Sequence, residues 1–364
     1  MMPVEAETEP VDLEDARTEE GEAEEVEPFR YAISSYGADY PVDGLVKRIR
    51  DGSIYVPKFQ RGFVWDLKDA SRFVESLLLG LPVPSIFLSN EPDTGKLLVV
   101  DGQQRLLSLR YFYDGTWEPT QQEFRLKGVQ PEYEARTYAL LRNEDRRRLD
   151  DAILHATVFK QDEPSEDESS VYEVFERLNT GGRELTPQEI RGAVHHSGQM
   201  RDVLADLNAH RSWREIYGSM DVRMRDQELI LRFLALLFDG DNYEPPMVAF
   251  LNRYMGRNKQ IGDDERSLMR RSFCDSIDLI LQSIGNRAFR PVRALNAAVF
   301  DSVMVGTAKR LRDGAVSDTR AYRSAYETLL SNHDFLDACG RGTASGERVR
   351  KRLELATNSF APLP

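Results

Sequence analysis

The apolar and polar positions of the chain follow different patterns before and after residue 200. Before it, apolar residues at helical spacing predict helices over 42–49, 66–79, 104–113 and 170–178, and short apolar runs predict strands at 54–56, 86–88, 97–100, 124–126 and 156–159. After it, long apolar stripes at helical spacing predict helices throughout. The fold class expected from these patterns is α+β, with a mixed domain followed by an all-helical domain.

The junction between the strand at 97–100 and the helix that follows carries a dense polar cluster. There the run Asp101-Gly102-Gln103-Gln104-Arg105 precedes renewed apolar helical spacing. The first N–H groups of a helix have no partner within it, and the helix dipole is positive there, so this junction suits an anion. Gly102 allows a ligand to approach the backbone, and Arg105 can donate two parallel hydrogen bonds to a phosphate. The alternative is that Asp101 and Gly102 form only the turn and cap between strand and helix.

An expected loop before the helix at 66–79 carries a second polar motif. Gln60 and Arg61 lie in this loop, where Arg61 can bind a phosphate and Trp65 can stack on a base or close the floor of the pocket. The alternative is that Phe59, Phe63 and Trp65 pack in the core and that Arg61 is in solvent.

A third motif lies at the end of the helix expected at 170–178. Arg177 and Asn179 stand before two glycines, and Thr186 then begins a capping box for the next helix. These two side chains can reach a bound nucleotide, or the stretch can be a plain connection between helices that needs no ligand.

Taken together, the stretches 56–65, 101–105 and 175–182 resemble, in this order, the N-terminal domain of GmrSD-type modification-dependent restriction enzymes. The resemblance extends over residues 40–195. That family is similar to the ParB/sulfiredoxin fold, which implies a nucleotide-binding domain with a small mixed sheet over 29–196 and a helical domain over 197–364. Its Asp-Gly-Gln-Gln-Arg motif is associated with nucleotide binding and hydrolysis.

The resemblance also implies a role for each motif residue. It implies a nucleoside triphosphatase with catalytic residues Asp101, Gln104 and Arg105, in which Asp101 holds Mg²⁺ or a water molecule. It implies that the nucleoside triphosphate (NTP), whose base is not specified, is bound by Gln60, Arg61, Gly102, Gln103, Arg177 and Asn179. Sulfiredoxin chemistry is excluded at this site, because Gln103 stands where that family has a cysteine and a glutamine supplies no thiolate.

Charge and cysteine content add two expectations. Residues 1–28 contain ten Glu, two Asp and one Arg, which leaves −2 of the chain's −13 for residues 29–364. These first 28 residues are expected to be a disordered acidic tail, either a solubilising appendage or a competitor of DNA phosphates for a basic groove. The two cysteines show no metal-binding spacing and no secretory leader precedes them, so a cytoplasmic protein is expected. No apolar run is long enough for a membrane span.

These observations lead to two hypotheses of different classes. The first is an NTP-binding and NTP-hydrolysing module of a DNA-targeting restriction or phage-defence system, which contacts double-stranded DNA and licenses a separate nuclease subunit. An HNH nuclease is not expected in this chain, because His333 lacks the strand–helix pattern of that motif. The alternative is a non-enzymatic module that binds nucleic acid or a partner and uses nucleotide as a switch ligand. The oligomeric state stays open.

Overall fold

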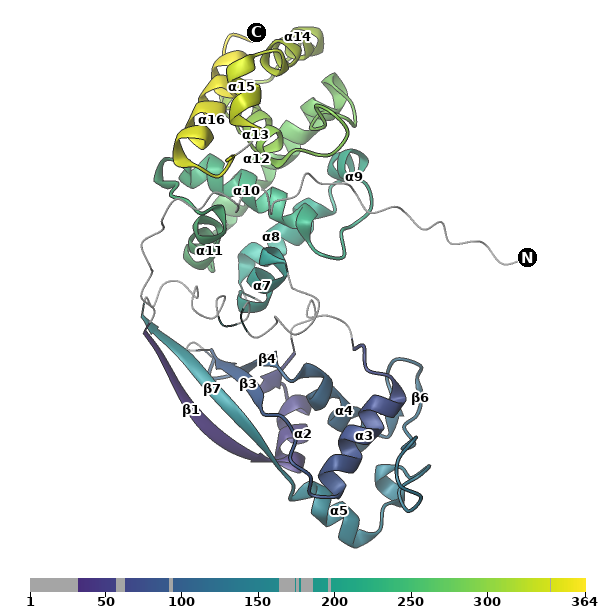
Figure 1. Ribbon diagram of the computed structural model, residues 1–364. Helices are drawn as coiled ribbons and strands as arrows, with labels where there is room; N and C mark the ends of the chain where they lie inside the picture. The colour runs from purple at the N-terminus through teal and green to yellow at the C-terminus, as the bar shows by residue number, and fades with distance from the viewer. Residues whose placement is uncertain are drawn as a thin grey trace, which may run out of the picture. The chain divides into compact units, whose positions relative to one another are not determined.

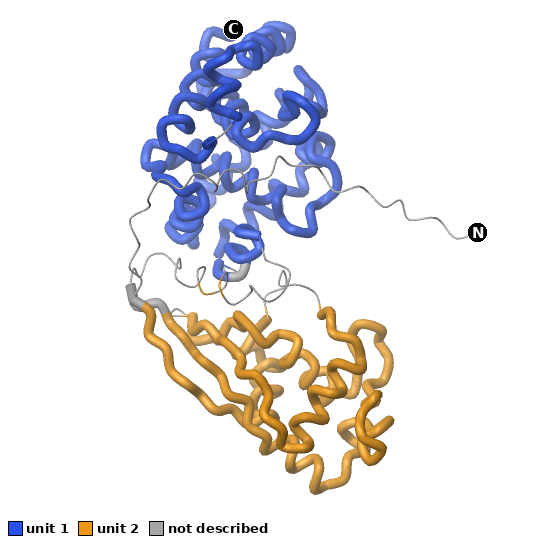
Figure 2. Tube along the Cα trace, in the orientation of Figure 1, with its two compact units in different colours: residues 1–29, 186–364 blue, residues 30–185 orange. Residues whose placement is uncertain are grey.

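The mixed and the helical patterns of the sequence correspond to two units of the computed structural model (Figure 2). The structure describes residues 32–56, 63–91, 94–163, 174, 177, 186–195, 198–340 and 342–364. The mixed unit is Arg30–Leu185, and the helical unit contains Thr186–Pro364. The division thus falls before the boundary expected after residue 196, and the tail 1–28 lies outside the described residues.

Among its described residues, the mixed unit contains one small mixed sheet, and the expected α+β class is confirmed. Its strands are β1 (Ala32–Pro41), β2 (Ile54–Tyr55), β3 (Ile86–Asn90), β4 (Leu97–Asp101) and β7 (Ile153–Glu163), in the order β1-β7-β3-β4-β2. β1 and β7 are antiparallel, as are β3 and β4, whereas β3 is parallel to β7 and β2 to β4. The antiparallel pair β3–β4 leads into the polar cluster. A separate ribbon consists of β5 (Thr116–Trp117) and β6 (Gln122–Glu123).

Helices lie beside this sheet and bury apolar side chains in a core shared with it (Figure 1). They are α2 (Val42–Arg50), α3 (Leu67–Leu78), α4 (Gln103–Asp114) and α5 (Asn143–Asp150), with a 3₁₀ turn η1 at Tyr138–Leu140. The Asp66 side chain caps α3 by accepting a hydrogen bond from the N–H of Asp69 at 2.8 Å. Val46, Val74 and Leu109 are among the residues that join β3 and β4 in the core. The helices expected at 42–49, 66–79 and 104–113 are therefore confirmed.

Two expectations for this unit had other outcomes. The prediction of a strand at 124–126 is wrong, because β6 ends at Glu123 and residues 124–126 are not part of a strand. Phe124 and Leu126 are nevertheless buried with Arg125 exposed, and this alternation imitates a strand. The helix expected at 170–178 lies outside the described residues except for positions 174 and 177, which are both helical.

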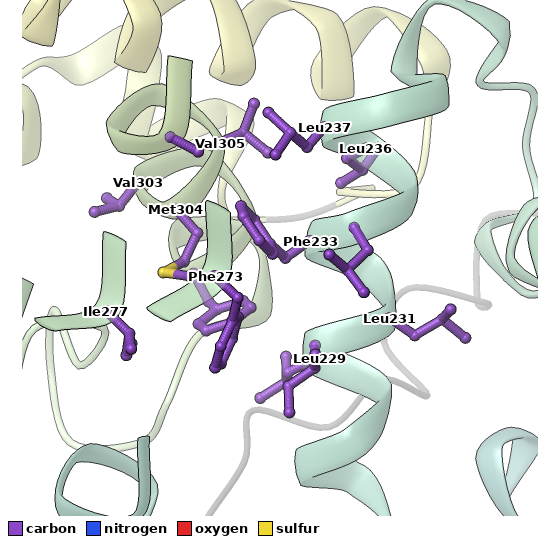
Figure 3. Packing of buried hydrophobic residues seen from close by; sticks show 14 of the residues in the cluster. Leu229, Leu231, Phe233, Leu236, Leu237, Phe273, Ile277, Val303, Met304 and Val305 are labelled. Carbon is purple, nitrogen blue, oxygen red and sulfur yellow. The ribbon is translucent and has the colours of Figure 1, made fainter. Parts of the chain in front are cut away.

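The helical unit begins with the capping box expected at Thr186, whose hydroxyl accepts from the N–H of Glu189. Its described helices are α7 (Pro187–Val194), α8 (Gln199–Asn208), α9 (Arg211–Tyr217), α10 (Arg225–Asp239), α11 (Met247–Arg257), α12 (Asp263–Ser283), α13 (Ala297–Leu311), α14 (Thr319–Leu330), α15 (His333–Ala338) and α16 (Gly346–Phe360), with a 3₁₀ turn η3 at Gly240–Asn242. Figure 3 shows Phe233 of α10 beside Phe273 of α12 and Met304 of α13 in one apolar core. The expected helical region after residue 200 is confirmed.

Helices α10, α13 and α16 of this unit are joined by a buried cluster of charges. Asp301 is fully buried and accepts from Arg232 at 2.8 Å and from Arg352 at 3.2 Å. Two cations thus share one carboxylate in the interior. None of the helices in the described part of the chain has the length and apolarity that a membrane crossing requires.

Candidate functional site

A bulge in β4 places the first residue of the polar cluster. Leu88 of β3 pairs with Val99, whereas Phe87 pairs with Asp101, so Val100 is an extra residue on β4. A bulge twists its strand and turns the side chains that follow it, and such irregularities are frequent beside active sites. Val99 and Val100 are both buried, and Asp101 comes at the point where the strand leaves the core.

Gly102 makes the turn from β4 into α4, and only glycine fits there. Its φ of +102° lies in the left-handed region that side chains avoid. A Cβ on this residue would also lie 2.4 Å from Cγ2 of Ile86, which is closer than any real contact. The carbonyl of Gly102 accepts the first hydrogen bond of α4, from Leu106 at 2.9 Å. The chain therefore passes against Ile86 with no side chain, and Gly102, as the N-cap residue, gives α4 no side-chain cap.

Arg105 and Asp101 form an ion pair across the first turn of α4. Nη2 of Arg105 lies 2.7 Å from Oδ2 of Asp101, and the two side chains are 13% and 44% exposed. Nε of Arg105 is buried and has no hydrogen-bond partner, and Oδ1 of Asp101 accepts no hydrogen bond from the described residues. A mostly buried guanidinium that keeps an unused donor is a ready partner for an anion.

Gln104 anchors the segment that precedes α3. Its Oε1 accepts hydrogen bonds from the N–H of Val64 at 2.9 Å and from that of Trp65 at 3.2 Å. The amide oxygen of Gln104 is therefore used within the protein, and what remains for a ligand is its NH₂ group.

The aromatic residues beside this segment pack in the core. Phe63 lies edge-on to Tyr111 with ring centroids 5.2 Å apart, and Trp65 lies edge-on to Phe73 at 5.8 Å. These contacts support the core alternative for Phe63 and Trp65 over the stacking of a base on Trp65. Phe59 lies outside the described residues.

The structure brings part of the expected site together. Asp101, Gly102, Gln103, Gln104 and Arg105 are consecutive at the end of β4 and the start of α4. Arg177 is exposed and helical. Gln60, Arg61 and Asn179 lie outside the described residues.

Two features of the site were not foreseen from the sequence. One is the close contact of Gly102 with Ile86, and the other is the bond of Gln104 to the backbone of 64–65. The sequence marked Ile86 only as part of an apolar run that predicts a strand. Such a run gives no information about the distance between Ile86 and Gly102. Gln104 accepts its hydrogen bond from Val64, which is 40 residues away in the sequence. A local sequence pattern cannot reveal a contact over that separation.

The chemistry of the described donors fits an anion together with a single bound cation. No group of three or more His, Cys, Asp or Glu is arranged for a metal ion in the part of the chain that is described. A nucleotide-bound Mg²⁺ needs no such group, since it is held by one or two carboxylates, water and the substrate phosphates. The carboxylate of Asp101, which is 44% exposed, meets that requirement.

Comparison with known proteins places this junction inside a known domain. Residues 42–196 match the family described as GmrSD restriction endonuclease, N-terminal domain. The match contains the whole of the 101–105 motif and ends beyond the mixed unit, within the helical one. A shorter stretch is 31% identical to an uncharacterized protein of Methanocaldococcus jannaschii, covering 18% of this chain and 16% of that protein. The resemblance expected from the motifs is thus confirmed for residues 42–196.

Proposed function

We propose that this chain is the nucleotide-binding and NTP-hydrolysing subunit of a DNA-targeting restriction or phage-defence system. The matched family is one of restriction endonucleases, which supports a role in a DNA-targeting system. The observation that carries the nucleotide assignment is the junction of β4 with α4, where a helix N-terminus without a side-chain cap stands beside the ion pair of the mostly buried Arg105 and the half-exposed Asp101.

Phosphate binding is assigned to the first turn of α4. The backbone N–H groups there and the positive end of the helix dipole favour a phosphate group. The side of Gly102 where a Cβ would lie is filled by Ile86, so Gly102 serves the tight turn into α4 and a phosphate would reach the N–H groups of the first turn from elsewhere. Arg105 adds a fixed positive charge and the unused Nε donor. Phosphoryl transfer depends mainly on positioning and on stabilising charge, and these groups supply both.

Asp101 has two roles in this proposal. Through Oδ2 it orients the guanidinium of Arg105, and through Oδ1 it holds Mg²⁺ or a water molecule. A bound Mg²⁺ would neutralise charge that develops on the phosphate oxygens. Asp101 and Arg105 are therefore the proposed catalytic residues.

Gln104 is proposed to act in part as a positioning residue. Its bonds to Val64 and Trp65 fix the chain just after Gln60 and Arg61 in the sequence. This anchor supports the inclusion of Gln60 and Arg61 in the NTP pocket, together with Gln103, Arg177 and Asn179 from the family resemblance. The NH₂ group of Gln104 is left to contact the nucleotide.

The proposal includes double-stranded DNA and a separate nuclease subunit as partners. Support for both comes from the restriction family matched by residues 42–196. The NTP cycle in the mixed unit would then license the nuclease once DNA is bound.

The test is phosphate release from the full chain with ATP, GTP, CTP and UTP in the presence of Mg²⁺, with and without double-stranded DNA. The variants are Arg105→Gln and Asp101→Asn. The matched control is Arg110→Gln, because Arg110 lies on the same helix and pairs with Asp114 and Glu118 at the surface. Circular dichroism and thermal unfolding verify that each variant is folded.

We expect turnover with at least one nucleotide, a loss of at least about 100-fold in the folded Arg105 and Asp101 variants, and little change in the control. Turnover that persists in both site variants would contradict the site. Nucleotide binding without turnover, detected as a rise in the thermal midpoint, would contradict hydrolysis and favour the switch-ligand alternative.

A further inference from the structure

A groove in the helical unit is lined by three arginines that the nucleotide site does not use. Arg287, Arg290 and Arg293 are spaced three residues apart in the segment between α12 and α13. The three line one depression with the end of α9, and its other lining residues are Glu215, Ile216, Tyr217, Gly218 and Asn286. The regular spacing thus brings three positive charges to one side of the segment.

The segment that carries these arginines is anchored to the core. Ala288 and Phe289, between Arg287 and Arg290, and Leu295, just after Arg293, are completely buried. The ring of Phe289 lies 4.8 Å from that of Phe300 in α13, and the hydroxyl of Tyr326 donates to the carbonyl of Ala288. These buried residues hold the segment that carries the arginines against the core, while Arg287 and Arg293 are exposed.

Arg290 is held in place by hydrogen bonds to carbonyl groups. Its Nη1 donates to Ile216 at 2.9 Å and to Asn286 at 3.0 Å, which connects α9 with the arginine segment. Burial lowers the pKa of Arg290, and the neighbouring positive charge of Arg287 lowers it further. Arg287 and Arg293 are exposed at the sides of the groove.

No carboxylate of the described residues forms an ion pair with these three arginines, which line one groove together. Glu215 also lines the groove. Many other arginines in this unit are paired: Arg191 with Glu228, Arg214 with Asp226, Arg225 with Asp221, Arg257 with Asp239, and Arg348 with Asp337. Like charges held together without a counter-charge repel one another, and a bound anion would relieve that repulsion.

We propose that the groove of Arg287, Arg290 and Arg293 binds the phosphate backbone of double-stranded DNA. Rigid guanidinium groups match phosphate geometry, and a row of them follows a chain of phosphates better than a single small anion. Tyr217, the aromatic residue of the groove, is buried, so no exposed ring is offered for stacking on a base. Contacts to phosphates carry no sequence information directly, so binding through this groove is independent of DNA sequence. This inference rests on the proposed function, in which DNA is a partner. It assigns the DNA-binding surface to this groove of the helical unit.

The test measures binding of the full chain to a short fluorescein-labelled DNA duplex by fluorescence anisotropy, between about 50 and 200 mM salt. The variant is Arg287→Gln with Arg293→Gln, which spares the hydrogen bonds of Arg290. The matched control is Arg266→Gln with Arg271→Gln on α12, two exposed arginines that lie about 18 Å or more along the helix axis from its end at Ser283. Unlabelled duplex and inorganic phosphate serve as competitors.

We expect the groove variant to weaken DNA binding at least about 10-fold at low salt and to reduce the slope of log Kd against log salt by about 2, while the control changes neither by much. Unlabelled duplex should displace the labelled one, and millimolar inorganic phosphate should not. Equal weakening in the two double variants, displacement by inorganic phosphate alone, or no binding of the wild type would each overturn the inference.

Phosphate release measured in the same samples separates this inference from the proposed function. The groove variant should keep its basal NTP turnover, because neither arginine belongs to the β4–α4 junction. Loss of DNA binding with turnover intact supports the groove. DNA binding that the groove variant leaves unchanged refutes the groove even if the chain hydrolyses NTP, and absent turnover with groove-dependent DNA binding refutes only the NTPase.

Discussion

Replacement of Asp301 by asparagine is expected to destabilise the helical unit severely. The substitution keeps the volume of the side chain and removes its charge, so no cavity complicates the result. In the folded protein the carboxylate lies 2.8 Å from Arg232 and 3.2 Å from Arg352. Without it, two guanidinium groups that are 4% and 0% exposed remain buried side by side. The structure thus predicts a large cost from a small chemical change.

The size of this cost follows from the two ion pairs. At an effective dielectric constant of about 20, each close pair gives roughly 4 kcal/mol of attraction before desolvation. Loss of one partner from a buried pair usually reduces the free energy of unfolding by about 3–5 kcal/mol. Such a loss is a large part of the roughly 5–15 kcal/mol that stabilises a domain.

Urea denaturation monitored by pulsed hydrogen exchange and mass spectrometry tests this prediction, because peptides from α10, α13 and α16 report on the helical unit alone. The control is Asp278→Asn, since Asp278 is half-exposed in its pair with His210 and such pairs contribute about 0–1 kcal/mol. A decrease of less than about 1 kcal/mol for Asp301→Asn would refute the reasoning. The triple variant in which Arg232 and Arg352 become Met and Asp301 becomes Leu should regain most of the loss.

Two further predictions concern Gly102 and His195. Gly102→Ala should lower the unfolding free energy of the mixed unit by about 2–4 kcal/mol, because the new Cβ meets Ile86 at a strained φ, and Ile86→Ala should relieve part of this loss. The control Gly44→Ala, on α2 with open space around it, should stabilise by about 0.5–1 kcal/mol, and equal effects on thermal unfolding would contradict the contact. Burial, aided by the charges of Lys259 and Arg191, lowers the pKa of His195 from 6.5 to about 3. Between these values the unfolded chain binds a proton that the folded chain does not, so stability is complete above pH 6.5 and falls as the pH decreases through this window. His195→Asn should flatten the dependence of the unfolding free energy of the helical unit on pH, and an unchanged slope would remove His195 as its source.

The elements that were predictable from the sequence are those whose signals are local. Helix α3 shows an apolar stripe with a capping aspartate, and the start of α7 shows a capping box, so both were placed correctly. Strand β1 gave no such signal, because residues 33–37 are exposed and follow no apolar alternation. It is a strand because it pairs with β7, more than 100 residues away, as in the register of Tyr36 with Val158. No window of local sequence contains that partner.

The candidate site was predictable in its composition but not in its internal contacts. The polar run 101–105 between a strand and a helix was visible in the sequence and lies where expected. The pairing of Arg105 with Asp101 is a contact between residues four apart at a helix start, which spacing allows but does not require. The bulge at Val100 depends on the register of β3 against β4, which the sequence does not specify.

The most direct test of the nucleotide site is hydrogen exchange of the backbone amides at the start of α4. The full chain is compared with and without Mg²⁺ and the hydrolysis-resistant imido analogues of ATP, GTP, CTP and UTP, in the wild type and in Arg105→Gln. The first N–H groups of a helix exchange rapidly because they have no partner within it, and phosphate oxygens bound there would protect them. The account predicts slower exchange over 103–105 with at least one analogue in the wild type and its loss in the variant. Unchanged exchange over 103–105 with every analogue would contradict the account.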